Sequence, residues 1–147
     1  MNRHLPNIFF FACLALAFAI YYPGTLGHFQ FDDIINIIEN DAIKIHILDF
    51  ESLSKVAFSG NAGFFKRPIS VVSFALNYYF TGSNPYYFKL TNIIIHLLNA
   101  IGIFYLSQLI LGTLSQTASA KSDEKNDRWV AAAIAAAWMF HPLNLTG

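Results

Sequence analysis

The chain has 147 residues, about the length of one domain. Hydrophobic residues make up 55% of it and charged residues 12%, about half the charge of an ordinary soluble domain. Nine basic residues balance nine acidic ones, so no net charge attracts nucleic acid, and a single cysteine, Cys13, excludes an intramolecular disulfide and a cysteine-cluster metal site. A disordered chain and a disulfide-rich secreted scaffold are excluded as well. The composition therefore favours a membrane protein over an unusually apolar soluble core.

Three apolar stretches predict transmembrane helices, at 5–22, 90–114 and 129–147. Asp, Glu, Lys and Arg are absent between Arg3 and Asp32, and again between Lys89 and Lys121. At about 1.5 Å per residue the first stretch reaches roughly 27 Å, close to a hydrocarbon core of about 30 Å. The third stretch is barely long enough to span before Gly147. Together they predict an all-α membrane protein with three transmembrane helices.

The first stretch also has the features of a signal peptide, since Arg3 precedes it and small residues at 15–19 offer a cleavage site. We expect an uncleaved helix instead, because further spans follow. The density of Lys and Arg gives the orientation: residues 115–128 carry three basic residues in 14, whereas residues 23–88 carry four in 66, against six acidic ones. The sequence therefore predicts a multi-pass protein of the cytoplasmic (inner) membrane, with a cytoplasmic loop at 115–128 and an outer loop at 23–88.

Two adjacent aspartates, Asp32 and Asp33, follow the first span within the apolar sequence FQFDDIINII. Carboxylates in such surroundings are costly unless they are solvated, paired or protonated. One explanation is structural, with Asp33 capping a helix from Ile34 to Asn40. The other is catalytic, and the residues alone leave both open. Because neighbouring side chains diverge by about 100° in a helix and face opposite sides in a strand, only one of the two is expected to face a substrate.

Three local elements are predicted further along the outer loop. Residues 43–47 alternate Ile with Lys and His, which is typical of a short strand. Residues 49–58 predict a short helix capped by Asp49 or Ser52. Residues 68–80 predict a helix that begins at a proline and bears a narrow polar stripe. At about 20 Å this helix is too short to cross a bilayer, so we expect an interfacial or protein-buried helix; if it did cross, the topology would invert.

Lys66 and Arg67 form the only adjacent basic pair in the chain. Snorkelling beside the membrane is the structural explanation, and a clamp for a phosphate is the functional one, because the planar guanidinium suits phosphate geometry. On the predicted topology His141, at the far end of the third span, also faces outside. The two aspartates, the basic pair and His141 are therefore predicted to gather at the outer membrane surface.

Four polar residues share one face of the second span because they recur at helical spacing: Lys89, Asn92, His96 and Asn99. Interhelical hydrogen bonds are the expected role of Asn92, Asn99 and His96, and His96 is the one of the three for which a chemical role stays open. The five histidines show no metal-ligand spacing, and the sequence contains no phosphate-binding loop and no nucleophile elbow. The sequence thus predicts neither metal ligands nor a cofactor, although it leaves a divalent metal open.

The order of these motifs resembles the N-terminal part of TMTC-type membrane proteins (transmembrane plus tetratricopeptide repeats) and their bacterial relatives, which are protein O-mannosyltransferase-like members of the GT-C superfamily of glycosyltransferases. The resemblance covers about residues 10–144. Its most specific pieces are FDD at 31–33, RP at 67–68, FALNY at 74–78, HLLN at 96–99 and HPL at 141–143.

The resemblance implies inverting transfer of a hexosyl group from a polyprenyl-phosphate-linked sugar donor to an unknown acceptor outside the cytoplasm. In GT-C enzymes an acidic residue of the first outer loop is commonly the catalytic base, and Asp32 and Asp33 occupy that place here. We expect Asp33 to be the base, because Asp32 directly follows an aromatic run and is more readily tied into loop packing. Arg67, with Lys66, is then expected to hold the phosphate of the donor.

Relatives of this type contain more spans and usually an array of repeats of about 34 residues, and no repeat occurs here. We therefore expect one membrane region, 1–147, that forms an N-terminal fragment of a GT-C-like bundle and is completed by further spans, for instance from a downstream-encoded chain. The alternative is a non-catalytic multispanning subunit that packs on a partner through the polar face of the second span. Membrane lipid, the sugar donor and an acceptor are the expected partners, and nucleic acid is not.

Overall fold

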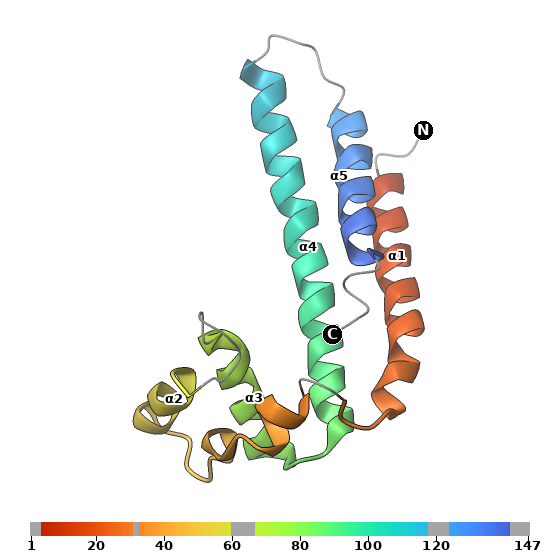
Figure 1. Cartoon of the computed structure of the whole chain (residues 1–147). Helices are drawn as coiled ribbons and strands as arrows, with labels where there is room; N and C mark the ends of the chain where they lie inside the picture. The colour runs from red at the N-terminus through yellow and green to blue at the C-terminus, as the bar shows by residue number, and fades with distance from the viewer. Residues whose placement is uncertain (1–3, 31–32, 60–66, 118–123, 142–147) are drawn as a thin grey trace. The chain divides into compact units, whose positions relative to one another are not determined.

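The computed structural model describes residues 4–30, 33–59, 67–117 and 124–141 (Figure 1). Every regular element within these ranges is helical, which confirms the all-α prediction for this part of the chain. The residue contacts divide the chain into two compact units. Residues 1–22 and 92–147 form a helical bundle, and residues 23–91 form an intervening unit.

The helical bundle is built from α1 (Leu5–Tyr21), α5 (Glu124–Met139) and most of α4 (Pro85–Thr117). Within it, α5 runs parallel to α1, and α4 runs antiparallel to both (Figure 1). Phe9 and Trp129, near the starts of α1 and α5, agree with the parallel pair because their ring centroids lie 5.5 Å apart.

Small residues let these helices approach closely. Ala131, Ala132 and Ala135 of α5 are fully buried, and they form one core cluster with Phe10 and Phe104. The rings of Phe10 and Phe104 stack, with centroids 4.2 Å apart and planes 10° from parallel. Alanine at such contacts is typical of packing between membrane helices, where close backbone approach takes the place of the hydrophobic effect.

Among the described residues, two helical segments are long and apolar enough to cross a membrane, Leu5–Leu26 and Pro85–Ser115. They contain the first two predicted spans, 5–22 and 90–114. The first segment exceeds α1 because a 3-10 turn continues the helix through Tyr22–Leu26.

The third predicted span, at 129–147, is wrong as a membrane-crossing helix in the part of the chain that the structure describes. Helix α5 has 16 residues, and its first turns carry charged side chains. Its apolar part, from Trp129 to Met139, rises only about 16 Å. The helix ends there because His141 precedes a proline, which disfavours the helical conformation. Residues 142–147 lie outside the described residues.

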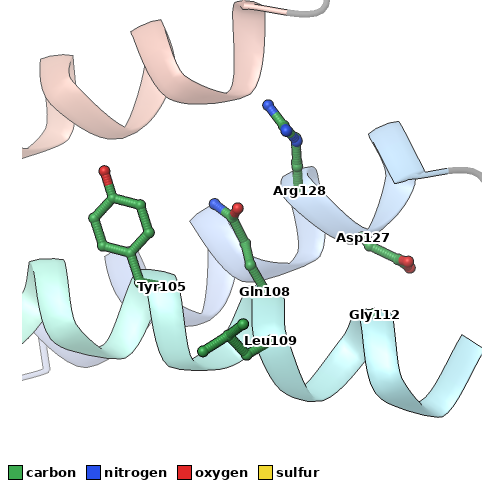
Figure 2. A pocket seen from close by; sticks show the side chains of 6 residues that line it. All are labelled: Tyr105, Gln108, Leu109, Gly112, Asp127 and Arg128. Atoms are coloured by element: carbon green, nitrogen blue, oxygen red, sulfur yellow. The ribbon is translucent and has the colours of Figure 1, made fainter.

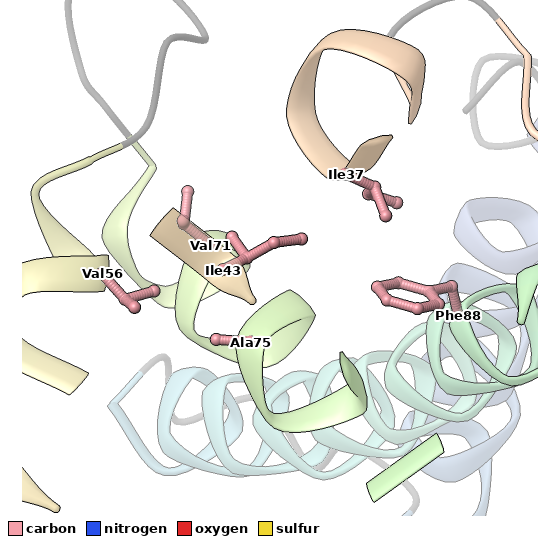
Figure 3. Packing of buried hydrophobic residues seen from close by; sticks show 6 residues of the cluster. All are labelled: Ile37, Ile43, Val56, Val71, Ala75 and Phe88. Carbon is pink, nitrogen blue, oxygen red and sulfur yellow. The ribbon is translucent and has the colours of Figure 1, made fainter. Parts of the chain in front are cut away.

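The intervening unit packs α2 (Phe50–Ala57) and α3 (Pro68–Thr81) around the fully buried Ile43, the last residue of a 3-10 turn at Asp41–Ile43. Figure 3 shows the buried side chains of this core, which are Ile37, Ile43, Val56, Val71, Ala75 and Phe88. Full burial of a large aliphatic or aromatic side chain contributes about 1.5–3 kcal/mol. The core therefore ties short segments that are separate in sequence into one unit.

Local signals set the helix boundaries here. Helix α2 begins where Oδ1 of Asp49 accepts a 2.7 Å hydrogen bond from the Ser52 N–H, which confirms the predicted cap. Helix α4 begins after Asn84, whose Oδ1 accepts from the Tyr86 N–H at 3.1 Å. Helix α3 ends at Gly82, whose φ of +66° is readily adopted only by glycine.

Two of the predicted outer-loop elements have different outcomes. The helix predicted at 68–80 is confirmed as α3, and its interfacial position stays a prediction. The strand predicted at 43–47 is wrong, because the described residues of this segment form the end of a 3-10 turn and irregular backbone. An isolated alternating segment has no partner strand to pair with its backbone groups. Moreover, Ile43 is fully buried whereas Ile47 is 68% exposed, so the isoleucines do not share one buried face.

Candidate functional site

Asp33 lies in the intervening unit, in a turn closed by two hydrogen bonds to Gln30. Its Oδ2 accepts from the Gln30 N–H at 3.3 Å, and its own N–H donates to the Gln30 carbonyl at 3.0 Å. The side chain makes no capping hydrogen bond to the helical turn that follows, which contradicts the structural explanation of Asp33 as a helix cap. Asp33 is half-buried, and Asp32 lies outside the described residues. The carboxylate of Asp33 is thus oriented by a single backbone donor.

A π-helical turn, Ile34–Ile38, follows Asp33 directly. It is closed by the Glu39 N–H, which donates to the Ile34 carbonyl at 2.9 Å. Ile37 anchors the turn in the core, whereas Ile34 and Ile35 are exposed. Single π turns occur frequently at functional sites, and this one was predicted as an ordinary helix. The segment after Asp33 therefore presents apolar side chains outward next to a carboxylate.

The backbone of Arg67 is strained. Its φ of 37° and ψ of 60° lie in the left-handed region, and it is the one described non-glycine residue with a positive φ. Such a conformation costs about 1–2 kcal/mol for an L residue. The side chain is exposed and has no hydrogen-bond or ion-pair partner among the described residues. Lys66 lies outside them.

Lys89 is a cation that the sequence analysis assigned to the second span but not to the site. Its Nζ donates to the His28 carbonyl at 2.8 Å. A Cβ added to Gly27 would lie 3.0 Å from the same Nζ. The ammonium group therefore contacts the loop that leads to Gln30 and Asp33. Its position before a long apolar stretch was visible in the sequence, but its partner was not, because the two residues are 61 positions apart.

His96, in the helical bundle, takes part in a contact that joins all three bundle helices. Its Nε2 lies 3.0 Å from the carbonyl oxygen of Met139, the last residue of α5. The hydroxyl of Tyr21, at the end of α1, donates to the same oxygen at 2.6 Å. The imidazole also stacks on Trp138, with centroids 4.8 Å apart. His96 therefore makes an interhelical hydrogen bond, the role expected of this polar face, and it is not an exception to that expectation.

The other two residues of that polar face differ from the expectation. Asn92 and Asn99 are exposed, and their side chains have no hydrogen-bond partner in the part of the chain that the structure describes. The predicted interhelical hydrogen bonds of these two residues are therefore absent within the described bundle.

The predicted site residues are only partly brought together. Asp33 and Arg67 belong to the intervening unit and make no hydrogen bond or ion pair with one another. His141 belongs to the helical bundle, is exposed, and donates its N–H to the Trp138 carbonyl at 3.2 Å. Its gathering with the aspartates stays a prediction. Among the described residues no group of three or more His, Cys, Asp or Glu is placed to hold a metal ion.

Comparison with known proteins supports the resemblance found in the motifs. The chain is 32% identical over 103 residues to the protein O-mannosyl-transferase TMTC1 of Mus musculus, and equally to that of Homo sapiens. The match covers 64% of this chain, and 11% of the mouse and 12% of the human protein, so the chain spans only a small part of the length of these relatives. No family model matches the chain, and no solved structure matches it. The chain is thus similar to TMTC-type proteins.

Proposed function

We propose that this chain carries the acidic outer loop and the first spans of a membrane glycosyltransferase that uses a polyprenyl-phosphate-linked sugar. The observation that carries the proposal is the 32% identity over 103 residues to proteins named protein O-mannosyl-transferase. Two helices long and apolar enough to cross a membrane support it, because a polyprenyl donor is itself anchored in the bilayer. The acceptor is an unidentified hydroxyl compound outside the cytoplasm.

Asp33 is the proposed general base. The Gln30 N–H holds Oδ2, which leaves Oδ1 to take the proton from an acceptor hydroxyl. The hydroxyl oxygen forms a bond to the anomeric carbon while the bond from that carbon to the phosphate oxygen breaks. The electron pair of the breaking bond leaves with the polyprenyl phosphate, and attack from the opposite side inverts the configuration.

Arg67, with Lys66, is the proposed contact for the departing phosphate. A guanidinium binds two phosphate oxygens through its planar fork. It stabilises the transition state more than the ground state, because negative charge grows on the phosphate as the bond breaks. The left-handed backbone of Arg67 supports this assignment, since strained residues cluster at ligand-binding sites. Lys89 is a further cation within the same unit.

The proposed topology makes α1 and α4 spans of the cytoplasmic (inner) membrane. Residues 23–88 lie outside and residues 115–128 lie in the cytoplasm. The density of Lys and Arg supports this orientation. It also places the aspartates on the side where a lipid-linked donor would meet an outer acceptor.

Donor binding tests the proposal directly. The purified chain in lipid nanodiscs is incubated with a photoreactive polyprenyl-phosphate mannose and irradiated. We expect labelling that unlabelled donor competes away and that Arg67→Lys weakens about tenfold, because an ammonium group lacks the bidentate fork. Lys55→Gln is the control, since Lys55 pairs with Glu51 at 2.7 Å on the surface of α2. Labelling that is indifferent to competitor and to Arg67→Lys contradicts the proposal.

A second candidate function, a non-catalytic subunit, is favoured by the exposed Asn92 and Asn99 on α4. Polar side chains on a membrane helix usually face protein rather than lipid. A photocrosslinker at position 99 would then capture a partner helix, whereas one at Leu98, which is 60% exposed, would capture lipid. Capture of a partner without any donor labelling would favour this function over the first.

A further inference from the structure

An open groove, lined by both apolar and polar groups, lies between α4 and α5 in the helical bundle. It is open on one side and has a volume of about 330 Å³. Its lining residues are Tyr105, Gln108, Leu109, Gly112, Asp127 and Arg128 (Figure 2). Four of the six side chains are polar or charged, although the groove is formed largely by a helix apolar enough to cross a membrane.

Three hydrogen-bond donors reach toward the same side of this groove. Figure 2 shows the Tyr105 hydroxyl, the Gln108 amide and the Arg128 guanidinium on one side of the α4 and α5 ribbons, with the Asp127 carboxylate turned away from them. Asp127 accepts a hydrogen bond from the Ser115 hydroxyl at 3.1 Å. The guanidinium carries five N–H donors, so it can keep a protein contact and still bind an anion. The groove therefore offers donors to an anionic group, and the Asp127 carboxylate in its lining accepts a hydrogen bond from Ser115.

The position of the groove along α4 matches the edge of a bilayer. The helix rises about 28 Å from Lys89 to Gln108, close to a hydrocarbon thickness of about 30 Å. If Lys89 lies at one boundary of the hydrocarbon core, Gln108 lies at the opposite boundary. The presence of Tyr105 and Trp129 near Gln108 and Arg128 in the sequence is consistent with an interface at this level, because Tyr and Trp concentrate at membrane–water interfaces.

We propose that this groove binds the phosphate of an anionic phospholipid headgroup, on the side of the membrane opposite to the donor site. Arg128 supplies the charge, Tyr105 and Gln108 supply further donors, and Leu109 offers apolar surface to an acyl chain. Gly112 leaves the space for the headgroup, since no atom lies within 4 Å of a Cβ added there. The proposal rests on the membrane placement given above and not on glycosyl transfer.

Lipid occupancy measured by native mass spectrometry tests the site. The purified chain in detergent is titrated with phosphatidylglycerol, with phosphatidylcholine, or with inorganic phosphate. We expect phosphatidylglycerol to bind about tenfold more tightly than phosphatidylcholine, because both lipids carry the phosphate but only choline adds a cation that the Arg128 guanidinium repels. Arg128→Gln should remove that preference and weaken binding of both lipids. Lys55→Gln is the charge control.

Gly112→Leu fills the groove without replacing a donor, and Gly102→Leu is its matched control. Both glycines lie in α4, and neither has an atom within 4 Å of an added Cβ, but only Gly112 lines the groove. Helix propensity rises at both positions, so both variants are expected to fold, which circular dichroism checks. We expect Gly112→Leu to lower phosphatidylglycerol occupancy several-fold and Gly102→Leu to leave it unchanged.

Three outcomes would overturn the proposal. They are equal binding of the two lipids, equal loss in both leucine variants, and competition by inorganic phosphate as strong as that by phosphatidylglycerol, which would point to a free anion. If Gly112→Leu does not fold, Arg128→Gln decides alone. Failure of the donor labelling described above leaves these outcomes unaffected, so the two proposals fail separately.

Discussion

The carbonyl oxygen of Met139 joins three helices, and removing its donors one at a time tests the packing of the bundle. Tyr21 donates to it at 2.6 Å and Nε2 of His96 lies 3.0 Å from it. As the last residue of α5, Met139 has a carbonyl without a partner inside its own helix, and its side chain is fully buried. The perturbations are Tyr21→Phe, which removes one hydroxyl, and His96→Phe, which keeps a ring against Trp138.

Each single substitution is expected to lower the free energy of unfolding by about 0.6–1 kcal/mol, the usual worth of one hydrogen bond between membrane helices. The double variant should lose more than the sum, by about 1 kcal/mol or more, because only then does the partly buried carbonyl lose both donors. Tyr79→Phe is the control, since Tyr79 is partly exposed and its described contact is a ring pair with Phe80.

The assay is unfolding by titration with sodium dodecyl sulfate in mixed micelles, followed by circular dichroism for wild type, both single variants, the double variant and the control. A coupling free energy within about 0.3–0.5 kcal/mol of zero is ordinary additivity. Additive losses would refute the claim that the two side chains share one acceptor.

Three further predictions concern the intervening unit and the topology. The pKa of Asp49 is lowered from 3.8 chiefly by the Ser52 backbone N–H, then by the Ser52 hydroxyl and by Lys55, so the cap contributes stability above pH 3.8 that is lost as pH falls through the lower folded-state pKa. Asp49→Asn, which keeps a capping oxygen, should remove this acid-dependent loss from thermal melts, and an unchanged profile would contradict the cap. Arg67→Asn should leave stability unchanged or raise it by up to about 1 kcal/mol, because Asn tolerates the left-handed region; a loss of stability in chemical unfolding would show that the side chain has a structural role. Ser122→Cys in a Cys13→Ala background should be labelled by an impermeant maleimide only after permeabilisation, and labelling of intact cells would reverse the proposed orientation.

Local patterns in the sequence predicted those parts of the fold that depend on local causes. The structure contains three features that such patterns predicted: the first two long apolar helices, the Asp49 cap and the proline at the start of α3. Each depends on residues that are close together in the sequence. The strand prediction at 43–47 failed because alternation alone supplies no partner strand. Ile43 instead ends a 3-10 turn, and its side chain is buried in the core with residues of α2 and α3.

The third span failed for a different reason. The apolar stretch predicted as this span extended past His141. The helix itself ends at Met139, before the proline that follows His141, and is therefore too short to cross a bilayer. The contacts of Lys89 with the His28 carbonyl and of Tyr21 with Met139 were also beyond prediction, because backbone carbonyls leave no mark in the sequence and the partners are 61 and 118 positions apart. Of the two aspartates, the sequence analysis expected Asp32 to be tied into loop packing and Asp33 to be the base. Because the Asp33 carboxylate itself accepts a backbone N–H, the Asp32→Asn variant has to accompany any test of Asp33.

The central claim is that the acidic turn at Asp33 takes part in sugar transfer, and one assay addresses it. Membranes from cells that produce the protein are incubated with radiolabelled polyprenyl-phosphate mannose, and label transferred from the donor to any acceptor is measured for wild type, Asp32→Asn, Asp33→Asn and the surface control Asp41→Asn. Asparagine keeps the shape of the carboxylate and removes the proton acceptor. We predict transfer by wild type and the control, its loss in Asp33→Asn with the photoreactive donor still bound, and a smaller effect of Asp32→Asn. Loss in Asp32→Asn with full transfer by Asp33→Asn would exchange the two roles, and full transfer by both variants would contradict the catalytic assignment.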